Sequence, residues 1–357
     1  MSDSSTPRIG DDVAKSKLPA HDPIQSIRLS RIITGIVGTQ LVYVAARLNL
    51  ADHLANGARS VADLAKATGV VESRLYRVLR ALSSLGLVTE LPARQFAITA
   101  LAQPLRADAP DSQRDLALMM GSSWHVAGWG NILQAVHKEE SAFEAVFQTD
   151  LFDYLDRNPE ASAVFGNAMT FTSRRHAEAI LAAYDFSGAT TLVDVGGGHG
   201  YLLGAVLEHH PGMRGVLFDA PSVVQGASVH LAAKGVTDRC EVVGGDFFAA
   251  VPPGGDLYML KYIIHDWDDA RAEALLRNCR RAMRAEAKLL IIDAVLPDRN
   301  ASFGKSWPDI EMMVLLPNGK ERTETEFHEL LGGAGFEIRQ ILSTRSELSI
   351  VEAVAMA

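Results

Sequence analysis

The sequence predicts an α/β chain in which an all-helical N-terminal domain with a winged helix precedes a doubly wound, mostly parallel sheet. Strands and helices alternate after Gly188, which is typical of a parallel sheet. A glycine-rich turn over Gly196–Gly200 joins the first of these strands to a helix. Residues 60–100 have the pattern of two short helices followed by two strands, which is typical of a winged helix. A chain of 357 residues is long enough for both domains.

The composition excludes several classes of protein. Hydrophobic residues make up 48% of the chain and charged residues 22%, as in ordinary globular domains. Two cysteines, Cys240 and Cys279, are too few for a disulfide framework. The apolar stretch between Arg31 and Arg47 is shorter than the roughly 18–20 residues of a membrane span, and the first 17 residues lack the apolar segment of a signal peptide. We therefore expect a cytoplasmic protein with no membrane partner.

The formal charge is negative overall but positive near the N-terminus. The net charge is −9, whereas residues 1–110 carry 13 basic and 9 acidic side chains. A negatively charged chain is poorly suited to nucleic acid, so we expect no nucleic-acid partner. One alternative stays open, because Arg74, Arg77 and Arg80 lie on the second helix of the winged helix. This alternative is a DNA-binding regulator that senses a small ligand.

The N-terminal domain is expected over residues 23–185, after a polar, mobile arm over residues 1–22. Residues 24–54 have the pattern of a helix that is apolar on more than one face. Such a helix is typically buried in a core or in a subunit interface. In the winged helix, Ser60 and Asp63 have the spacing of a capping box at the start of the first helix.

The C-terminal domain is expected over residues 186–357. The expected strands cover residues 191–195, 214–218, 240–243, 257–262 and 289–295, with two closing strands over 338–343 and 348–354. Helical segments lie between them, among them residues 269–283. The carboxyl ends of parallel strands meet at one edge of a sheet, and open α/β sheets bind their ligands there.

The turn from Gly196 to Gly200 has the features of a ligand-binding loop. Glycine lets the backbone turn tightly and approach a ligand that a Cβ atom would block. The third glycine stands at Gly200, one residue earlier than the dinucleotide fingerprint requires. This spacing suits S-adenosylmethionine, which has no pyrophosphate. A purely structural turn is the alternative.

Acidic residues follow the next two strands. Asp219 stands 23 residues after Gly196, where a carboxylate can accept hydrogen bonds from both hydroxyls of a ribose. Asp246 and Phe247 follow the third strand, where a carboxylate and an aromatic ring would lie beside an adenine. The alternatives are a helix cap or a turn for the carboxylates and core packing for Phe247.

A histidine follows the fourth strand, within the segment Lys261–Asp269. His265 is expected beside the switch point of the sheet, and its ordinary pKa of about 6.5 suits a general base. The alternatives are a helix-capping histidine and a metal site that adds Asp266, Asp268 and Asp269. We expect Asp268 and Asp269 to form the cap and first turn of the following helix instead, so no metal site is predicted.

Five motifs together resemble one family. The glycine loop, LFDAP, GGDFF, LKYIIHDW and NGKERT occur in this order, and the resemblance covers about residues 25–355. The chain is similar to the caffeate-type, plant-like small-molecule O-methyltransferases, including the bacterial members that act on natural products. The resemblance implies a Rossmann-like class I methyltransferase sheet, S-adenosylmethionine as cosubstrate and no metal. It also implies a homodimer formed through the N-terminal domain.

The resemblance further implies roles for individual residues. The methyl donor would contact Gly196, Asp219, Asp246, Phe247 and Lys261. His265 would be the general base, with its imidazole oriented by Asp293 and Glu321. Four residues match acceptor-lining positions of the family, with core packing as an equal alternative: Phe165, Met169, Met312 and Met313.

These expectations combine into one predicted function. A dimeric enzyme would transfer a methyl group from S-adenosylmethionine to a hydroxyl group of an aromatic small molecule. His265 would take the hydroxyl proton, while Asp293 and Glu321 would stabilise the imidazolium. The alternatives are the DNA-binding regulator and the same fold carrying out N-methylation, C-methylation or hydroxylation.

Overall fold

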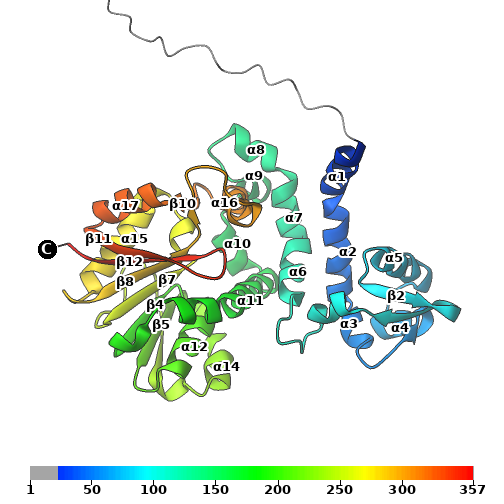
Figure 1. Ribbon diagram of the computed structural model, residues 1–357, viewed down its shortest axis with the longest axis horizontal. Helices are drawn as coiled ribbons and strands as arrows, with labels where there is room; N and C mark the ends of the chain where they lie inside the picture. Colours follow the sequence, from blue (N-terminus) through cyan, green and yellow to red (C-terminus); the bar gives the residue numbers. More distant parts are fainter. Residues whose placement is uncertain (1–22, 357) are drawn as a thin grey trace, which may run out of the picture.

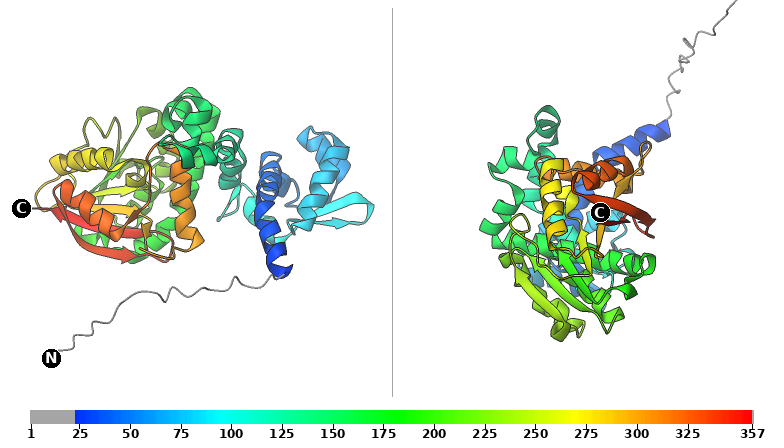
Figure 2. Two further views of the ribbon diagram at one scale, coloured as in Figure 1. Left: turned by 90° about the horizontal axis from the view of Figure 1, so that it is seen from above. Right: turned by 90° about the vertical axis from the view of Figure 1, so that its left-hand side faces the viewer.

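The computed structural model describes residues 23–356, so the arm expected over residues 1–22 lies outside the described residues. The sheet domain and the winged helix occupy opposite ends of the molecule, and a group of helices lies between them (Figure 1, Figure 2). This arrangement matches the predicted order of an N-terminal helical part followed by a sheet domain.

A seven-stranded sheet forms the centre of the C-terminal domain, with the strand order β11-β12-β8-β7-β4-β5-β6. Strands β4 to β8 run parallel, and β11 and β12 are antiparallel to their neighbours. The bounds are β4 Thr191–Val195, β5 Arg214–Asp219, β6 Cys240–Gly244, β7 Leu257–Lys261, β8 Lys288–Asp293, β11 Phe336–Ser343 and β12 Ser349–Ala355. The strand order reverses between β4 and β7, so the carboxyl ends of these two strands form the switch point where such sheets bind ligands.

Helices cover both faces of this sheet (Figure 1). On one face, α15 and α17 contribute Leu275 and Phe327 to a buried apolar cluster. On the other face, α11, α12 and α14 contribute Ile180, Leu203 and Leu231. The bounds are α11 Pro159–Ala183, α12 Tyr201–His209, α13 Pro221–Val224, α14 Ala227–Ala233, α15 Asp269–Ala282 and α17 Glu324–Gly333. The predicted doubly wound α/β fold is therefore confirmed.

Short elements complete the connections. They are the 3₁₀ turns η1 Pro92–Arg94, η2 Ala100–Leu105, η3 Phe186–Gly188, η4 Thr237–Arg239 and η5 Ile264–Asp266, and the paired strands β9 Val295–Leu296 and β10 Arg322–Thr323. Turn η5 follows β7, and β10 precedes α17. These two elements carry most of the residues that surround His265, as described below.

The winged helix is present and includes one strand that the pattern did not predict. Its elements are β1 Arg59–Ser60, α4 Val61–Thr68, α5 Glu72–Ser84, β2 Val88–Leu91 and β3 Gln95–Ile98. The Ser60 hydroxyl caps α4, because it accepts a hydrogen bond from the Asp63 backbone N–H. Ser60 also pairs with Gln95, which makes β3 the central strand of a three-stranded sheet. A strand of two residues is too short to show an alternating pattern.

The single helix expected over residues 24–54 is interrupted. It consists of α1 Pro23–Ile33, α2 Gly35–Arg47 and α3 Leu50–His53. The Thr34 hydroxyl donates to the Ser30 carbonyl oxygen (2.9 Å), a contact that tends to bend helices, and Gly35 is a weak helix former. Within residues 23–356 no single helix is long and apolar enough to cross a membrane; α1 and α2 meet that criterion only as a pair, which is bent by 43°.

The helices in the middle of the molecule share their core with a segment from the C-terminal half. Their bounds are α6 Arg114–Gly121, α7 Ser123–Gly130, α8 Ile132–His137, α9 Ala142–Phe147 and α10 Leu151–Arg157. Helix α16 (Phe303–Leu315) packs against α7, α8 and α9. Its Met312 and Leu315 join Trp124 and Phe143 in one buried apolar cluster. Chain segments on both sides of residue 185 therefore form a common core.

A buried polar contact also links α16 to α7. The Glu311 carboxylate accepts a hydrogen bond from the indole N–H of Trp129 (2.6 Å) and lies 2.7 Å from Nε2 of His125. His125 and Glu311 are both buried, so each depends on the other to satisfy its polar atoms. This contact fixes the rotation of α16 relative to the helical domain.

Apolar side chains on α1 and α2 are exposed. The side chains of Ile27, Ile32, Ile33, Ile36 and Val37 are 56–75% exposed. Contiguous apolar surface of this kind is rare on monomeric proteins and typically marks an interface. We therefore expect a second copy of the chain to cover this surface.

The chain should sediment as a homodimer at micromolar concentration, and Ile32→Glu combined with Ile36→Glu should shift it to a monomer. The reason is that two unpaired carboxylates would have to be buried in an apolar interface. Val229 on α14, which is 70% exposed, offers a control, and Val229→Glu should leave the dimer intact. A wild-type chain that sediments as a monomer would contradict this prediction.

Candidate active site

The glycine turn after β4 lies tightly against its neighbours. Gly196 has a φ of +71°, and its backbone N–H donates to the Phe218 carbonyl oxygen (2.8 Å). A Cβ atom on Gly196 would lie 2.3 Å from Cδ1 of Ile263, in the segment after β7. The positive φ therefore favours glycine at this position, and a larger residue would also displace the Ile263 side chain.

Asp219 at the end of β5 is held by the same turn. Its carboxylate accepts hydrogen bonds from the backbone N–H groups of Gly198 and Ala220, each at 2.7 Å. Burial raises the pKa of Asp219, and these two hydrogen bonds oppose that shift. A carboxylate can accept about four hydrogen bonds, so each oxygen keeps a free lone pair for a ligand.

Asp194 is a buried carboxylate that the sequence interpretation missed. It lies in β4 directly before the glycine turn and is 2% exposed. Burial and the neighbouring Asp219 raise its pKa to about 7, and the Lys261 ammonium opposes the shift. The pattern did contain an indication, since an acidic residue interrupts an otherwise apolar strand next to a glycine turn.

The segment after β6 places an aromatic ring at the edge of the same region. The Phe247 ring meets Trp267 edge to face, with 6.0 Å between ring centroids. Its carbonyl oxygen accepts a hydrogen bond from the Asn278 side chain (2.8 Å), which anchors the segment to α15. The exposed Asp246 accepts a hydrogen bond from the Phe248 backbone N–H (2.8 Å). The anchoring by Asn278 could not be read from the sequence, because 31 residues separate the partners.

Lys261 and Tyr262 follow at the end of β7. Burial lowers the pKa of Lys261 to about 7, although Asp293 and Asp194 oppose the shift. The ammonium nitrogen lies 4.0 Å from the ring centroid of Tyr262. Tyr262 has a φ of +56°, a strained conformation for a bulky residue, and such strain clusters at functional sites. Its backbone N–H donates to Oδ1 of Asp293 (2.9 Å).

His265 lies on turn η5 and is 6% exposed. Its Nδ1 atom is 2.7 Å from Oε1 of Glu321, and its Nε2 atom is 3.4 Å from Oδ1 of Asp266. The imidazole stacks on the Tyr262 ring, with 5.0 Å between centroids and 15° between planes. A proton on Nδ1 satisfies the Glu321 carboxylate, which leaves Nε2 as the nitrogen that exchanges protons with a ligand.

The electrostatic environment of His265 differs from the expectation of an ordinary imidazole. Burial alone would lower its pKa, but the carboxylates of Glu321, Asp266 and Asp293 outweigh burial and raise the pKa to about 10. Burial raises the pKa of Asp266 to about 7 and that of Asp293 to about 6, although the imidazole opposes both shifts. At neutral pH the ring therefore carries two protons before any ligand binds.

Asp293 and Glu321, the two carboxylates expected to orient His265, are placed differently. Glu321 contacts the imidazole directly, whereas Asp293 bonds to the backbone of Tyr262. Among the described residues, Oδ2 of Asp293 and Oε2 of Glu321 are buried without a hydrogen-bond partner. Asp293 therefore acts on the ring through its charge and through the position of Tyr262.

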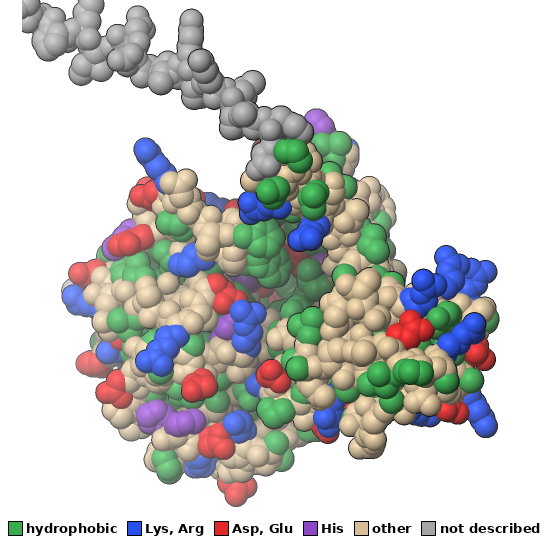
Figure 3. Space-filling view, turned by 45° about the vertical axis from the view of Figure 1, so that its right-hand side comes forward, with side chains coloured by type: hydrophobic (Ala, Val, Ile, Leu, Met, Phe, Trp, Pro, Cys, Tyr) green, Lys and Arg blue, Asp and Glu red, His purple; other side chains and the backbone are tan. Residues whose placement is uncertain are grey.

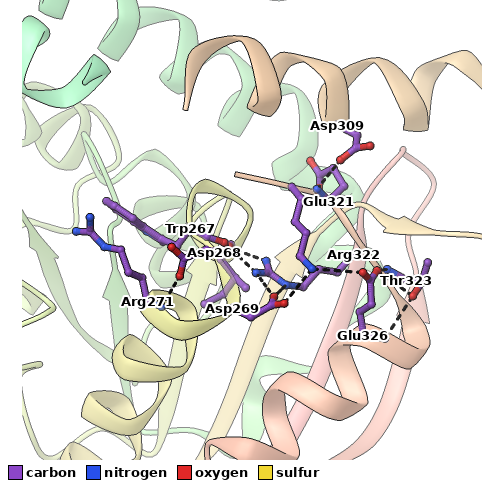
Figure 4. A network of polar contacts seen from close by, with 11 residues as sticks. Trp267, Asp268, Asp269, Arg271, Asp309, Glu321, Arg322, Thr323 and Glu326 are labelled. Atoms are coloured by element: carbon purple, nitrogen blue, oxygen red, sulfur yellow. Dashed lines mark hydrogen bonds and ion pairs between the residues drawn. The ribbon is translucent and has the colours of Figure 1, made fainter. Parts of the chain in front are cut away.

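Polar contacts hold the segment after His265 (Figure 4). The Asp268 side chain caps α15 by accepting a hydrogen bond from the Arg271 backbone N–H (2.8 Å). Asp269 in the first turn pairs with Arg322 and Lys320. The predicted cap is therefore confirmed. Within residues 23–356, no three His, Cys, Asp or Glu side chains are arranged to hold a metal ion.

The four candidate acceptor-lining residues lie in one apolar cluster. Phe165 and Met169 come from α11, and Met312 and Met313 come from α16. A Cβ atom on Gly319 would lie 3.0 Å from the His265 carbonyl oxygen and 3.3 Å from Cβ of Met312, so α16 passes close to η5. Figure 3 shows the molecule hollowed between the sheet domain and the N-terminal helices, with hydrophobic side chains at the rim. Their role in lining the acceptor stays a prediction.

His199 in the glycine turn reaches α11. Its Nδ1 atom lies 2.9 Å from the Thr170 hydroxyl, and its ring stacks on His230 with 5.5 Å between centroids. A Cβ atom on Gly166 would lie 3.0 Å from the ring, so a larger residue there would require the ring to shift. The glycine turn is thereby tied to the helix that carries Phe165 and Met169.

Comparisons with known proteins match the chain to one family. Residues 129–337 match an O-methyltransferase domain, and residues 30–108 match an O-methyltransferase dimerisation domain. A phenazine O-methyltransferase, PhzM, from Lysobacter antibioticus is 46% identical over 331 residues, which cover 93% of this chain and 96% of that protein. A phenazine-1-carboxylate N-methyltransferase from Pseudomonas aeruginosa is 33% identical over 325 residues, which cover 91% and 97%.

Solved structures agree with this match. The crystal structure of LaPhzM superposes with a TM-score of 0.90 at 45% identity, covering 94% of this chain and 100% of that one. NcsB1, an O-methyltransferase from neocarzinostatin biosynthesis, was solved with S-adenosylmethionine and 2-hydroxy-5-methyl naphthoic acid. It superposes with a TM-score of 0.78 at 31% identity, covering 89% and 96%.

Replacing Glu321 by Gln should lower the pKa of His265 from about 10 toward its ordinary value. The reason is that the variant loses the nearest negative charge and its charge-assisted hydrogen bond to Nδ1. NMR titration of the imidazole resonances measures this pKa. Glu324→Gln, at an exposed position in the first turn of α17, is the control and should leave it unchanged. An unchanged pKa in Glu321→Gln would contradict the assigned contact.

Proposed function

The chain belongs to the plant-type O-methyltransferase family, and we propose that it methylates a hydroxyl group of an aromatic natural product with His265 as the general base. Membership makes it an S-adenosylmethionine-dependent methyltransferase of small-molecule natural products. The observation that carries the proposal is the buried His265–Glu321 contact at the carboxyl end of β7, beside the glycine turn.

The residues at the switch point suit the methyl donor. Asp219 keeps free lone pairs on both carboxylate oxygens, as two ribose hydroxyls require. At Gly198, whose N–H donates to that carboxylate, a Cβ atom would meet nothing within 4 Å, so the turn leaves open space at this residue. We assign Gly196, Asp246, Phe247 and Lys261 to the same donor site.

The reaction is an in-line displacement at the methyl carbon. The bond from the acceptor oxygen to carbon forms as the carbon–sulfur bond breaks, and the sulfur keeps the electron pair. The products are the methyl ether and S-adenosylhomocysteine. The donor is already electrophilic, so the protein has to align the reactants and remove the hydroxyl proton. That proton passes to Nε2 of His265, while Glu321 holds the Nδ1 side of the ring.

The raised pKa of His265 has a consequence for this step. A phenol has an ordinary pKa of about 10, and the pKa of His265 is also about 10. The raised pKa therefore makes the deprotonated imidazole a stronger base toward the acceptor hydroxyl than an ordinary histidine. At neutral pH one of the two protons must first leave the site, so turnover should rise with pH through the neutral range.

Two functions other than O-methylation would give a different product or require a different partner. Methylation of a nitrogen is favoured by the similarity to an N-methyltransferase, and the NMR shift of a ¹³C-labelled methyl group distinguishes it from an ether. A DNA-binding regulator has less support, because it has no need of a buried histidine paired with a carboxylate at the switch point of the sheet. Incubation with a panel of phenolic and phenazine-like acceptors, read by mass, tests the proposed class.

His265→Gln should lower kcat by about 10²–10⁴, the usual contribution of a positioned general base. Binding of S-adenosylhomocysteine should stay unchanged by calorimetry, since the donor site is intact. His328→Gln, at an exposed position on α17, is the control and should keep full activity. Full turnover of His265→Gln would exclude His265 as the base. A chelator separates the metal alternative, because that alternative requires inactivation by EDTA and rescue by Mg²⁺.

Asp219→Ala should weaken binding of S-adenosylhomocysteine by about 2–4 kcal/mol, because each hydrogen bond to a carboxylate contributes roughly 1.5–3 kcal/mol. The substitution also removes the acceptor of the Gly198 backbone N–H, and this hydrogen bond orders the turn. Isothermal calorimetry measures the change, and Asp238→Ala at an exposed position on η4 is the control. Equal affinities of wild type and Asp219→Ala would refute the assignment.

A further inference from the structure

Arg322 is a fully buried arginine that the described reaction does not use. Its side chain has no exposed surface, and it ranks among the largest fully buried side chains of the described chain. It follows Glu321 directly and lies in strand β10, two residues before α17 begins. Burying a guanidinium is costly unless its N–H groups find acceptors, so the contacts of Arg322 indicate what the burial achieves.

The guanidinium bonds to the chain before and after His265, and Figure 4 shows Arg322 beside Trp267 and Asp269. Nη1 donates to the carbonyl oxygen of Ile264, and Nη2 donates to that of Trp267, each at 2.9 Å. Nε and Nη2 also donate to Oδ1 of Asp269, at 3.1 and 2.8 Å. Turn η5 is only three residues long, and its own backbone gives the Ile264 carbonyl one long hydrogen bond, from the Trp267 N–H (3.4 Å).

The two residues before Arg322 hold His265 itself. The Lys320 backbone N–H donates to the His265 carbonyl oxygen (2.8 Å), and Glu321 contacts the imidazole (2.7 Å). Lys320 thus holds the backbone of His265, Glu321 holds its ring, and Arg322 holds the carbonyl groups on either side. A lysine could not replace Arg322, because its single ammonium lacks the planar fork that reaches three acceptors at once.

We propose that Arg322 is a positioning residue that fixes turn η5 and thereby the place of His265 Nε2 relative to the acceptor hydroxyl. The inference rests on the proposed role of His265 as the base. It predicts that the guanidinium affects the chemical step through His265 and leaves donor binding unaffected, since its contacts lie on the 264–269 segment.

The first experiment compares Arg322→Lys with Arg277→Lys. Arg322→Lys keeps the charge but loses the fork, so kcat should fall about 10–100-fold, as small misplacements of reacting groups do. Affinity for S-adenosylhomocysteine should stay within twofold, and the NMR-measured pKa of His265 should fall because its contact with Glu321 loosens. Arg277 on α15 pairs at the surface with Glu273, so Arg277→Lys should behave like wild type. Unchanged kcat in Arg322→Lys would overturn the proposal.

A double-mutant cycle separates this proposal from the proposed function. If Arg322 acts through His265, Arg322→Lys should lower kcat strongly in the wild-type background and less than twofold in the His265→Gln background. An equal loss in both backgrounds would overturn the positioning role. Full turnover of His265→Gln alone would instead refute the base assignment, whatever Arg322→Lys does.

Thermal unfolding shows whether Arg322→Lys folds. Should it not fold, Asp269→Asn tests the same arrangement, because the Asp269 side chain is 62% exposed and anchors only the outer edge of the guanidinium. We expect Asp269→Asn to fold and to lower kcat about 3–10-fold with unchanged donor affinity. This expected loss is smaller because the two carbonyl contacts remain. Wild-type kcat in a folded Asp269→Asn would count against the proposal.

Discussion

The charge balance around one buried imidazole is the constraint on which the rest of the site depends. Asp266, Asp293 and Glu321 all act on His265, and uncompensated charges are costly once water is excluded. The structure reduces this cost with short contacts, one from the ring to Glu321 and one from the Tyr262 N–H to Asp293. The left-handed backbone of Tyr262 allows the second contact. The strained residue after β7 therefore helps to balance the charges around His265.

Elements outside the main sheet supply the partners that this balance requires. Glu321 is held by its backbone N–H, which donates to Asp309 of α16 (3.0 Å; Figure 4). Strand β10, which pairs with β9 rather than with the large sheet, carries Arg322. The strand order of the sheet thus determines where a ligand binds, whereas α16 and β10 determine the position and orientation of the imidazole. This division fits a family whose members include both an O-methyltransferase and an N-methyltransferase.

The sequence predicted the features that depend on local pattern. The strands before the glycine turn and before His265 were found because each is a short apolar run next to a distinctive motif. Features that depend on distant partners were missed. The raised pKa of His265 arises from carboxylates as far as 56 residues away, and Arg322 looked like an ordinary basic residue in a polar motif. Strand β1 and the break at Thr34 were missed because each involves too few residues to form a period.

The packing of α16 against the helical domain has a consequence for how the chain folds during its synthesis. Helices α7 to α9 are synthesised long before Met312 and Leu315, which complete their apolar cluster. Until then, those helices expose apolar surface and the Trp129 indole lacks Glu311, its acceptor. Cotranslational folding of the N-terminal half is therefore incomplete, and the last step joins segments from both halves of the chain. A gene fragment that ends at residue 185 would encode a domain without part of its own interior.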